Sequence, residues 1–285
     1  MNSTSICPRK TAARETYLWA CDLELRAFKP GNVSDYAPGH DMTADDFRIS
    51  AKVSVDPLVA SESLGARILG GVTATRKAVG CNTNLGILLL AAPLIEAFLD
   101  PDHDSLEASL RQVLARTQAT DAESVFAAIC HAKPGGLGDA AEADVRDPPQ
   151  VTLLEAMALA AERDSIARQY TCSFSDIFRK GVPMYDYRLS LGDSPDWAAV
   201  AVFITLLRQL GDSHIERKFG KGALDAFSDE IAHIEGLFSG PVLPENVLDP
   251  LRRLDLSFKS KGVNPGTTAD MTVASLMAHR LSRLY

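Results

Sequence analysis

Apolar residues recur at intervals of three and four along most of the chain, which is the spacing of one face of an α-helix. Alternating runs of β-branched residues, which would indicate strands, are nearly absent. We therefore expect an all-α protein, a single-domain multi-helix bundle formed by residues 1–285. The expected helices are Lys10–Ala27, one that begins near Thr43, Ser61–Val79, Asn84–Leu99, Leu106–Thr117, Ala122–His131, Thr152–Tyr170, Asp196–Gln209, Ser213–Phe219, Ala223–Phe238, Glu245–Ser257 and Thr267–Leu284.

Two of these helices carry clear signals at their ends. Pro30 and Gly31 should end the first helix, because proline removes a backbone donor and glycine favours turns. Thr152 with Glu155 three residues later has the spacing of a capping box. Asp164 would then lie on the apolar side of the helix that begins there. Such a carboxylate must be paired with an arginine, protonated or bound to a metal, because burying an unpaired charge costs free energy.

Composition excludes several classes of function. The net charge of -8 and the pI near 5.3 make the surface a poor partner for nucleic acid, although a local basic pocket for a phosphorylated ligand is compatible with them. The five cysteines include no CxxC pair, which argues against a zinc cluster and against a disulfide framework and favours a cytoplasmic protein. The most apolar window, Leu85–Ile95, is too short to span a bilayer, so we expect no membrane partner.

Several polar clusters lie in the breaks between the expected helices. The first is FKPGNVSDYAPGHDM, which contains Lys29, Asn32, His40 and Asp41 and follows Glu24 by one helical turn. Lys29 is either a phosphate contact or an ordinary lysine at the end of a helix. The adjacent His40 and Asp41 are either an acid–base pair, metal ligands or a solvated turn. Spacing alone leaves these alternatives open.

A second cluster, CNTNLG, precedes the most apolar helix. Asn82, Thr83 and Asn84 could present amide and hydroxyl groups, together with free helix N–H groups, to an anion. A helix cap needs only one such residue, so three in a row favour a binding site modestly. A third, KPGGLGDAAEADVR, matches neither nucleotide-binding glycine pattern, and we expect it to be a long functional loop rather than a linker.

Two further clusters lie in the second half of the chain. Asp212 should cap a short helix that carries Arg217 and Lys218, two cations suited to a triphosphate or carboxylate, or to a solvated basic turn. Near the C-terminus, the segment NPGTTAD spans Asn264 to Asp270 and leads into the last helix, with a threonine as the expected cap.

Taken in order, these segments resemble the triphosphoribosyl-dephospho-CoA synthase family. The matching pieces are Glu24 with KPGNV, then GHDM, the NT of CNTNLG, DSIARQY, DSHIERKFG and NPGTTADM, and they extend over nearly the whole chain. The resemblance implies an all-helical fold, a Mg²⁺–ATP requirement and a transferase activity. In that reaction the triphosphoribosyl group of ATP moves from adenine to a ribose hydroxyl of dephospho-CoA and forms an α-glycosidic bond.

The chain differs from the better-known members at several positions. It has KPGNVS where they have KPGLVD, and NTNLGI where they have NTHKGA, so that Asn84 replaces a histidine and Leu85 a lysine. The NTNLGI form resembles an archaeal and methylotroph branch. For that branch, an alternative is phosphoribosyl transfer from phosphoribosyl pyrophosphate to a pterin-type acceptor in the biosynthesis of tetrahydromethanopterin.

The resemblance and the chemistry of an anomeric carbon together suggest roles for these residues. Departure of the base builds positive charge on the ribose, which calls for carboxylates, while the phosphates call for cations. Asp41 and Asp164 are the candidate metal-binding or charge-stabilising acids, and Glu24 or His40 the candidate base. The candidate phosphate and sugar contacts are Lys29, Asn32, Asn82, Thr83, Asn84, Asp212, Arg217, Lys218, Asn264 and Asp270.

Two other classes of function stay open at this stage. One is a helical module that binds a nucleotide or a partner protein without catalysis. The other is a glycohydrolase, which would transfer the sugar to water. A homodimer is a further candidate assembly.

Overall fold

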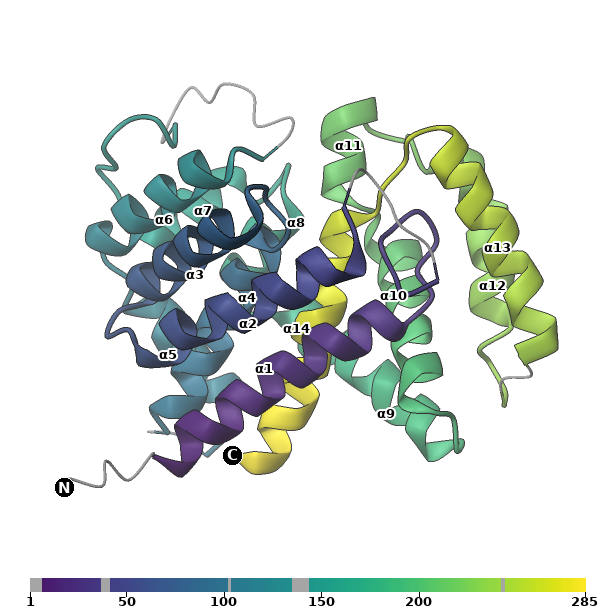
Figure 1. The fold of residues 1–285 in the computed structure, drawn as a ribbon, viewed down its shortest axis with the longest axis horizontal. Coiled ribbons are helices and arrows are strands. Elements are labelled where there is room, and N and C mark those ends of the chain that lie inside the picture. Colours follow the sequence, from purple (N-terminus) through teal and green to yellow (C-terminus); the bar gives the residue numbers. More distant parts are fainter. Residues whose placement is uncertain (1–6, 37–41, 102–103, 135–143, 242–243) are drawn as a thin grey trace.

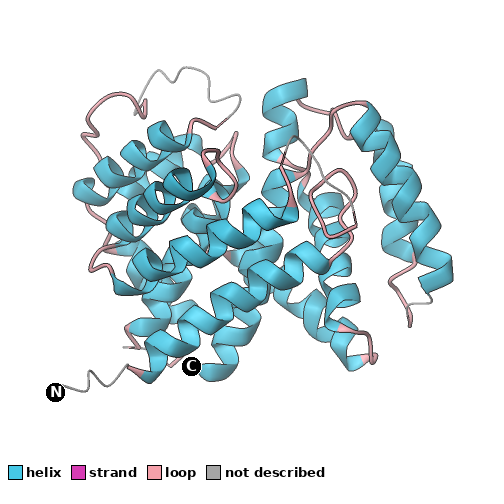
Figure 2. Ribbon diagram, viewed as in Figure 1, coloured by secondary structure: helices cyan, strands magenta, loops and turns pink. Residues whose placement is uncertain are grey.

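The computed structural model describes residues 7–36, 42–101, 104–134, 144–241 and 244–285. These residues form α-helices, two short helical turns and loops, with no strand among them (Figure 2), so the all-α prediction is confirmed. The helices are α1 (Pro8–Arg26), α2 (Ala44–Ala60), α3 (Leu64–Val79), α4 (Leu85–Leu99), α5 (Leu106–Ala115), α6 (Ala119–Ala132), α7 (Leu153–Ala160), α8 (Ser165–Thr171), α9 (Val182–Ser190), α10 (Pro195–Leu210), α11 (Ser213–Phe219), α12 (Ser228–Gly236), α13 (Pro244–Ser260) and α14 (Gly266–Leu284). The turns are η1 (Ile177–Gly181) and η2 (Asp225–Phe227).

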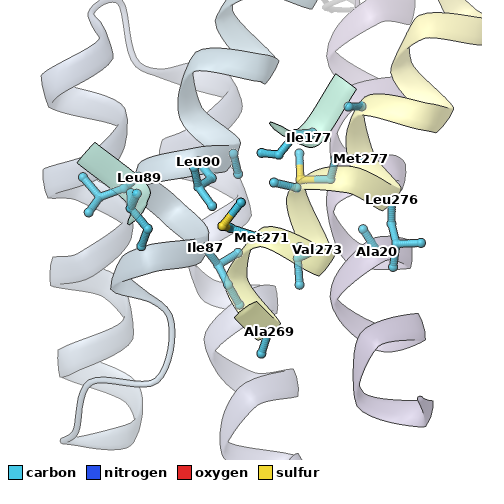
Figure 3. Packing of buried hydrophobic residues seen from close by; sticks show 14 of the residues in the cluster. Ala20, Ile87, Leu89, Leu90, Ile177, Ala269, Met271, Val273, Leu276 and Met277 are labelled. Carbon is cyan, nitrogen blue, oxygen red and sulfur yellow. The ribbon is translucent and has the colours of Figure 1, made fainter. Parts of the chain in front are cut away.

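Helices α4 and α14 form the centre of the molecule. Both are buried on nearly all sides, as expected of a helix surrounded by protein. Helix α14 packs against α1, α4, α10 and η1 (Figure 1). Figure 3 shows Leu90 of α4, Met271 of α14 and Ala20 of α1 in the same packed cluster. The rest of the bundle therefore surrounds two helices whose first residues lie next to each other.

The turn after α1 is packed tightly against α13. Gly31 has a φ of +77°, a conformation that favours glycine, and its N–H donates to Asp255 Oδ1 at 2.8 Å. A Cβ at this position would lie 2.8 Å from both the Phe258 ring and the Val263 carbonyl oxygen. The glycine after Pro30 is thus required by both backbone conformation and space.

The prediction of one continuous helix over Thr152–Tyr170 is wrong, because the helix is interrupted in its middle. The capping box at its start is present, with the Thr152 N–H donating to Glu155 Oε2 at 2.8 Å. However, α7 ends at Ala160 and a new helix, α8, begins at Ser165. Asp164 starts that helix, because its Oδ1 accepts the N–H groups of the second and third residues of α8. Asp164 is therefore a helix cap and does not lie on an apolar helix face.

Two other regions differ from the sequence expectation. Helix α9 and the turn η1 were not expected, because this segment has no long apolar period; the fully buried Arg188 fixes it by donating to the carbonyl oxygens of Phe238 and Gly240. Helix α12 begins at Ser228 and not at Ala223, since the preceding residues form η2.

Two further expectations from the sequence concern disulfide bonds and membrane-spanning helices. All five cysteine side chains are free thiols. Within the described residues, no helix combines the length and the hydropathy that a membrane span requires.

Candidate functional site

A cavity of about 420 Å³ lies where α4, α8, α11 and α14 begin. Residues at these four helix starts line it, namely Asn84, Asp164, His214 and Gly266. Glu24 on α1 adds a carboxylate from a further wall. This volume is in the range that encloses a small-molecule ligand.

The cavity brings together most of the site residues expected from the sequence. Those that line it are Glu24, Asn32, Asn82, Thr83, Asn84, Asp164, Arg217, Asn264 and Asp270. Lys29, Asp212 and Lys218 are close in sequence to lining residues but do not line the cavity themselves. The predicted His40 and Asp41 lie outside the described residues.

Glu24 and Lys29 form a buried ion pair beside the cavity. Lys29 Nζ lies 3.1 Å from Glu24 Oε1, and it also donates to the carbonyl oxygens of Glu24 at 2.8 Å and Val33 at 2.7 Å. The lysine side chain is fully buried, and its ammonium group organises the turn through these contacts. Burial raises the pKa of Glu24, and the Lys29 charge offsets part of that rise. The contact between Lys29 and a phosphate stays a prediction. In the structure Glu24 lines the cavity, and Lys29 contacts Glu24 without lining the cavity itself.

The three polar residues before α4 are anchored to neighbouring backbone and to α2. Asn82 Oδ1 accepts the Leu85 N–H at 3.1 Å, so Asn82 binds the first backbone donor of the helix, although Asn84 occupies the cap position. The Thr83 hydroxyl donates to Ser50 Oγ at 2.6 Å, and Asn84 Nδ2 donates to Ser54 Oγ at 3.3 Å. These bonds fix the backbone at the start of α4 relative to the cavity.

Asp164 links the start of α8 to α11. Its Oδ1 accepts two backbone N–H groups of α8, and its Oδ2 lies 2.5 Å from Arg217 NH1. Both side chains are partly exposed and line the cavity. The pairing of Asp164 with an arginine, one of the alternatives from the sequence, is thus observed. It places a cation at the cavity wall with a fixed orientation.

Asp212 joins the starts of α11 and α14. Its Oδ1 caps α11, as predicted, and its Oδ2 accepts both the N–H and the hydroxyl of Thr268 at 2.8 Å. Thr268 is therefore a donor to Asp212, and the expected threonine cap of the last helix is wrong: Pro265 occupies the cap position. Burial raises the pKa of Asp212 to about 6, although its four hydrogen bonds favour the charged form.

Asp270 faces the cavity from the first turn of α14. No hydrogen bond or ion pair to its carboxylate occurs among the described residues. The carboxylate lies against Gly86, where an added Cβ would be 2.0 Å from Asp270 Oδ2. Burial raises the pKa of Asp270 well above its usual range, and the charges of Glu24, Asp212 and Asp164 raise it further. The site therefore contains one carboxylate paired with lysine, Glu24, and one without a cation in contact.

Two asparagines in the wall of the cavity are hydrogen-bonded to each other. Asn32 Nδ2 donates to Asn264 Oδ1 at 2.8 Å, which links the turn after α1 to the segment before α14. Both residues line the cavity. Their remaining amide groups can bind hydroxyl or phosphate oxygens of a ligand.

Helix starts and cations make part of the cavity suitable for an anion. The cap residues of α4 and α14, Asn84 and Pro265, make no side-chain cap hydrogen bond. Other groups accept several of the first-turn N–H groups, and among the described residues those of Gly86, Ile87 and Thr267 have no acceptor. Arg163 is exposed and lines the cavity, and its guanidinium makes no ion pair within the described part of the chain. With Arg217 it provides two cations.

The other end of the cavity is apolar. Its walls include residues of α4, α6 and α7, among them Leu89, Phe126 and Met157. The polar clusters in the sequence gave no sign of this region, because its residues look like ordinary core positions. Arg163 was also missed as a site residue, although it directly precedes Asp164 in the sequence.

The described residues do not form a metal site of their own. No group of three or more histidine, cysteine, aspartate or glutamate side chains with a suitable arrangement occurs among them. Asp164, one predicted metal ligand, already binds the α8 N–H groups and Arg217. The other predicted ligand, Asp41, lies outside the described residues.

Comparison with known proteins gives one sequence family and one fold. The model of the ATP:dephospho-CoA triphosphoribosyl transferase family matches residues 10–285. The fold is similar to that of a protein from Archaeoglobus fulgidus that was solved as a candidate triphosphoribosyl-dephospho-CoA synthase. That comparison has a TM-score of 0.62 and 20% sequence identity, and it covers 82% of this chain and 96% of the other. No match was found among curated proteins.

Proposed function

The chain belongs to the ATP:dephospho-CoA triphosphoribosyl transferase family, and from this premise we propose how its cavity carries out the reaction. The enzyme is a transferase that moves the triphosphoribosyl group of ATP to dephospho-CoA and releases adenine. One observation supports the assignment of the site: nine residues expected from the sequence line one cavity of about 420 Å³.

The triphosphate binds at the side of the cavity that carries Arg163 and Arg217. A guanidinium can donate two parallel hydrogen bonds to phosphate oxygens, and the starts of α4 and α14 add backbone N–H groups. Asp164 holds Arg217 in place for this contact. Asn32 and Asn264, which are hydrogen-bonded to each other and also line the cavity, orient the sugar or the phosphates.

Glu24 is the base that removes the proton from the attacking ribose hydroxyl. Burial raises the pKa of Glu24 towards neutral pH, and a general base is most effective when its pKa lies near the pH of the reaction. Lys29 is the positioning residue, because it fixes one carboxylate oxygen of Glu24 from behind. The negative charges of Glu24 and Asp164 also stabilise the positive charge that develops on the ribose.

Mg²⁺ enters this proposal as part of the substrate, Mg²⁺–ATP. Mg²⁺ keeps several waters and is commonly bound through substrate phosphates with one or two carboxylates. It therefore does not require the three-residue protein cluster that the described residues lack.

The experiment that tests the function is incubation of the protein with Mg²⁺, ATP and dephospho-CoA, followed by mass spectrometry. We expect free adenine and a product whose mass equals that of dephospho-CoA plus the triphosphoribosyl group. Binding of ATP without adenine release would contradict the proposal and favour a non-catalytic module. Adenine with free sugar triphosphate in the presence of acceptor would contradict transfer and indicate a glycohydrolase.

Two finer expectations belong to the same proposal. Phosphoribosyl transfer to a pterin-type acceptor is the alternative, motivated by Asn84 and Leu85 at the start of α4. It predicts that phosphoribosyl pyrophosphate replaces ATP as donor and that pyrophosphate is released. A homodimer predicts twice the mass of the 30.7 kDa chain in light scattering.

A further inference from the structure

The stereochemistry of the reaction requires two groups that handle protons. ATP carries its adenine on the β face of the ribose, whereas the product bond is α, so a single displacement inverts the anomeric carbon. The attacking hydroxyl and the leaving base then occupy opposite faces of the sugar. The hydroxyl needs a base on its side, and adenine leaves more easily when one of its ring nitrogens gains a proton. The assignment of Glu24 as base leaves the acid to be identified.

We propose that Asp270 is the general acid that protonates adenine as it leaves, an assignment that rests on the proposed transfer reaction. Asp270 lines the cavity from α14, while Glu24 lines it from α1. In Figure 3 the neighbours of Asp270, Ala269 and Met271, lie beside Ile87 at the start of α4. The two carboxylates thus reach one cavity from different helices.

The surroundings of Asp270 place it where the polar and apolar parts of the cavity meet. A Cβ on Gly86 would lie 2.0 Å from Asp270 Oδ2 and 2.8 Å from Ile166 Cδ1. The carboxylate and an apolar wall residue therefore both meet the backbone at Gly86. A ligand with its ribose at the polar end and its planar base at the apolar end would place the glycosidic bond near this junction.

The charges around the two carboxylates distinguish their roles. Glu24 is in contact with Lys29, which favours the ionised form expected of a base. Asp270 has no cation in contact among the described residues, and it faces Glu24 from α1, Asp164 before α8, and Asp212 before α11, with Arg217 on α11 as the opposing charge. Burial and these carboxylates raise the pKa of Asp270, which favours the protonated form expected of an acid.

In the proposed step Asp270 gives up one proton and Glu24 takes up one. The C1′–N9 bond breaks, its electron pair stays on adenine, and the Asp270 proton moves to a ring nitrogen of the base. The acceptor oxygen forms the new C1′–O bond, and its proton moves to Glu24. Transfer of that proton from Glu24 back to Asp270 through solvent restores the enzyme.

The test compares two donors, ATP and its N7-methylated analogue, whose base leaves without being protonated. With ATP, we expect Asp270→Asn to lower kcat by about 10²- to 10⁴-fold. With the N7-methylated donor the same variant should lose less than about tenfold, because the acid is no longer needed. Glu24→Gln should lose activity with both donors. Asp249→Asn, on the exposed side of α13, is the matched control and should keep wild-type rates.

The outcomes separate this inference from the function on which it rests. Equal losses of Asp270→Asn with both donors, or no loss with ATP, would overturn the role of Asp270 while the wild-type enzyme still releases adenine. Absence of adenine release by the wild-type enzyme would instead contradict the transfer reaction itself. Circular dichroism and thermal unfolding of each variant establish that it is folded before rates are compared.

Discussion

Lys29 Nζ lies 3.1 Å from Glu24 Oε1, and both side chains are buried beside the cavity. Removal of the ammonium group would leave an unpaired buried carboxylate and three carbonyl oxygens without this donor. We expect Lys29→Met to lower the free energy of unfolding by about 3–5 kcal/mol at pH 7, measured by urea denaturation.

The exposed ion pair between Arg14 and Asp56 provides the control for this prediction. Arg14→Met should change stability by no more than about 1 kcal/mol, because solvent screens the pair. The Glu24→Gln/Lys29→Met double variant should recover part of the stability that Lys29→Met loses. If Lys29→Met and Arg14→Met are equally stable, the buried pair does not hold the turn.

Arg217 and Lys218 are adjacent in sequence but differ in position. Arg217 lines the cavity, whereas Lys218 does not, and Lys218 Nζ donates to the Gly262 carbonyl oxygen at 3.2 Å. A charged hydrogen bond contributes about 1.5–3 kcal/mol, so Arg217→Ala should raise the KM for ATP by roughly 10- to 100-fold. Lys218→Ala should change it less than about threefold, because Lys218 does not line the cavity and its hydrogen bond is exposed to solvent. Similar KM values for the two variants would contradict the placement of the triphosphate.

Gly86 provides space for the Asp270 carboxylate. An added Cβ would come within 2.0 Å of Asp270 Oδ2, so Gly86→Ala should lower the free energy of unfolding by about 1–3 kcal/mol and impair turnover. In an Asp270→Ala background, the same substitution should cost less, because the clash with the carboxylate is gone and only the contact with the flexible end of Ile166, at 2.8 Å, remains.

Gly236, at the end of α12, is the control position for this experiment, since nothing lies within 4 Å of a Cβ there. Gly236→Ala should be neutral or slightly stabilising. An equal cost of Gly86→Ala with and without the Asp270 side chain would show that the two residues do not compete for space.

Asp270 should make the stability of the protein depend on pH. Its pKa is raised in the folded state, so the folded protein keeps a proton that the unfolded chain releases above about pH 4. The contribution of Asp270 to the free energy of unfolding is therefore fully present below about pH 4, and it is lost as the pH rises towards the raised pKa of the folded state. We expect Asp270→Asn to have the wild-type Tm at pH 4 and a higher Tm at pH 8, measured by differential scanning calorimetry. A lower Tm of the variant at pH 8 would be inconsistent with the unpaired carboxylate.

The sequence predicted most helices of this fold because their apolar positions have a clear helical period. It predicted the caps made by Thr152 and Asp212 because each needs only residues that are local in sequence. The break at Asp164 was missed, since a carboxylate that caps a helix and one that lies on a helix face have the same sequence pattern. Its actual surroundings depend on Arg217, which is 53 residues away.

The composition of the candidate site was predicted better than the roles of its residues. Polar residues in the loops and on the neighbouring helices, ordered by the family resemblance, identified nine lining residues. Local sequence could not reveal that the Lys29 side chain turns inward to Glu24, or that Asp270 lies against Gly86, since these contacts depend on packing between helices. The apolar wall around Phe126 and Met157 was missed because core and ligand-facing apolar residues look alike in sequence.

The most direct measurement is a competition between two donors in one reaction. The enzyme receives Mg²⁺, dephospho-CoA, ATP labelled with ¹³C in its ribose, and unlabelled phosphoribosyl pyrophosphate, and the products are analysed by mass spectrometry. We expect the labelled ribose, with its three phosphates, to appear in the product in a ratio of about one to the adenine released. Unlabelled ribose in the product, with pyrophosphate and no adenine, would contradict this expectation.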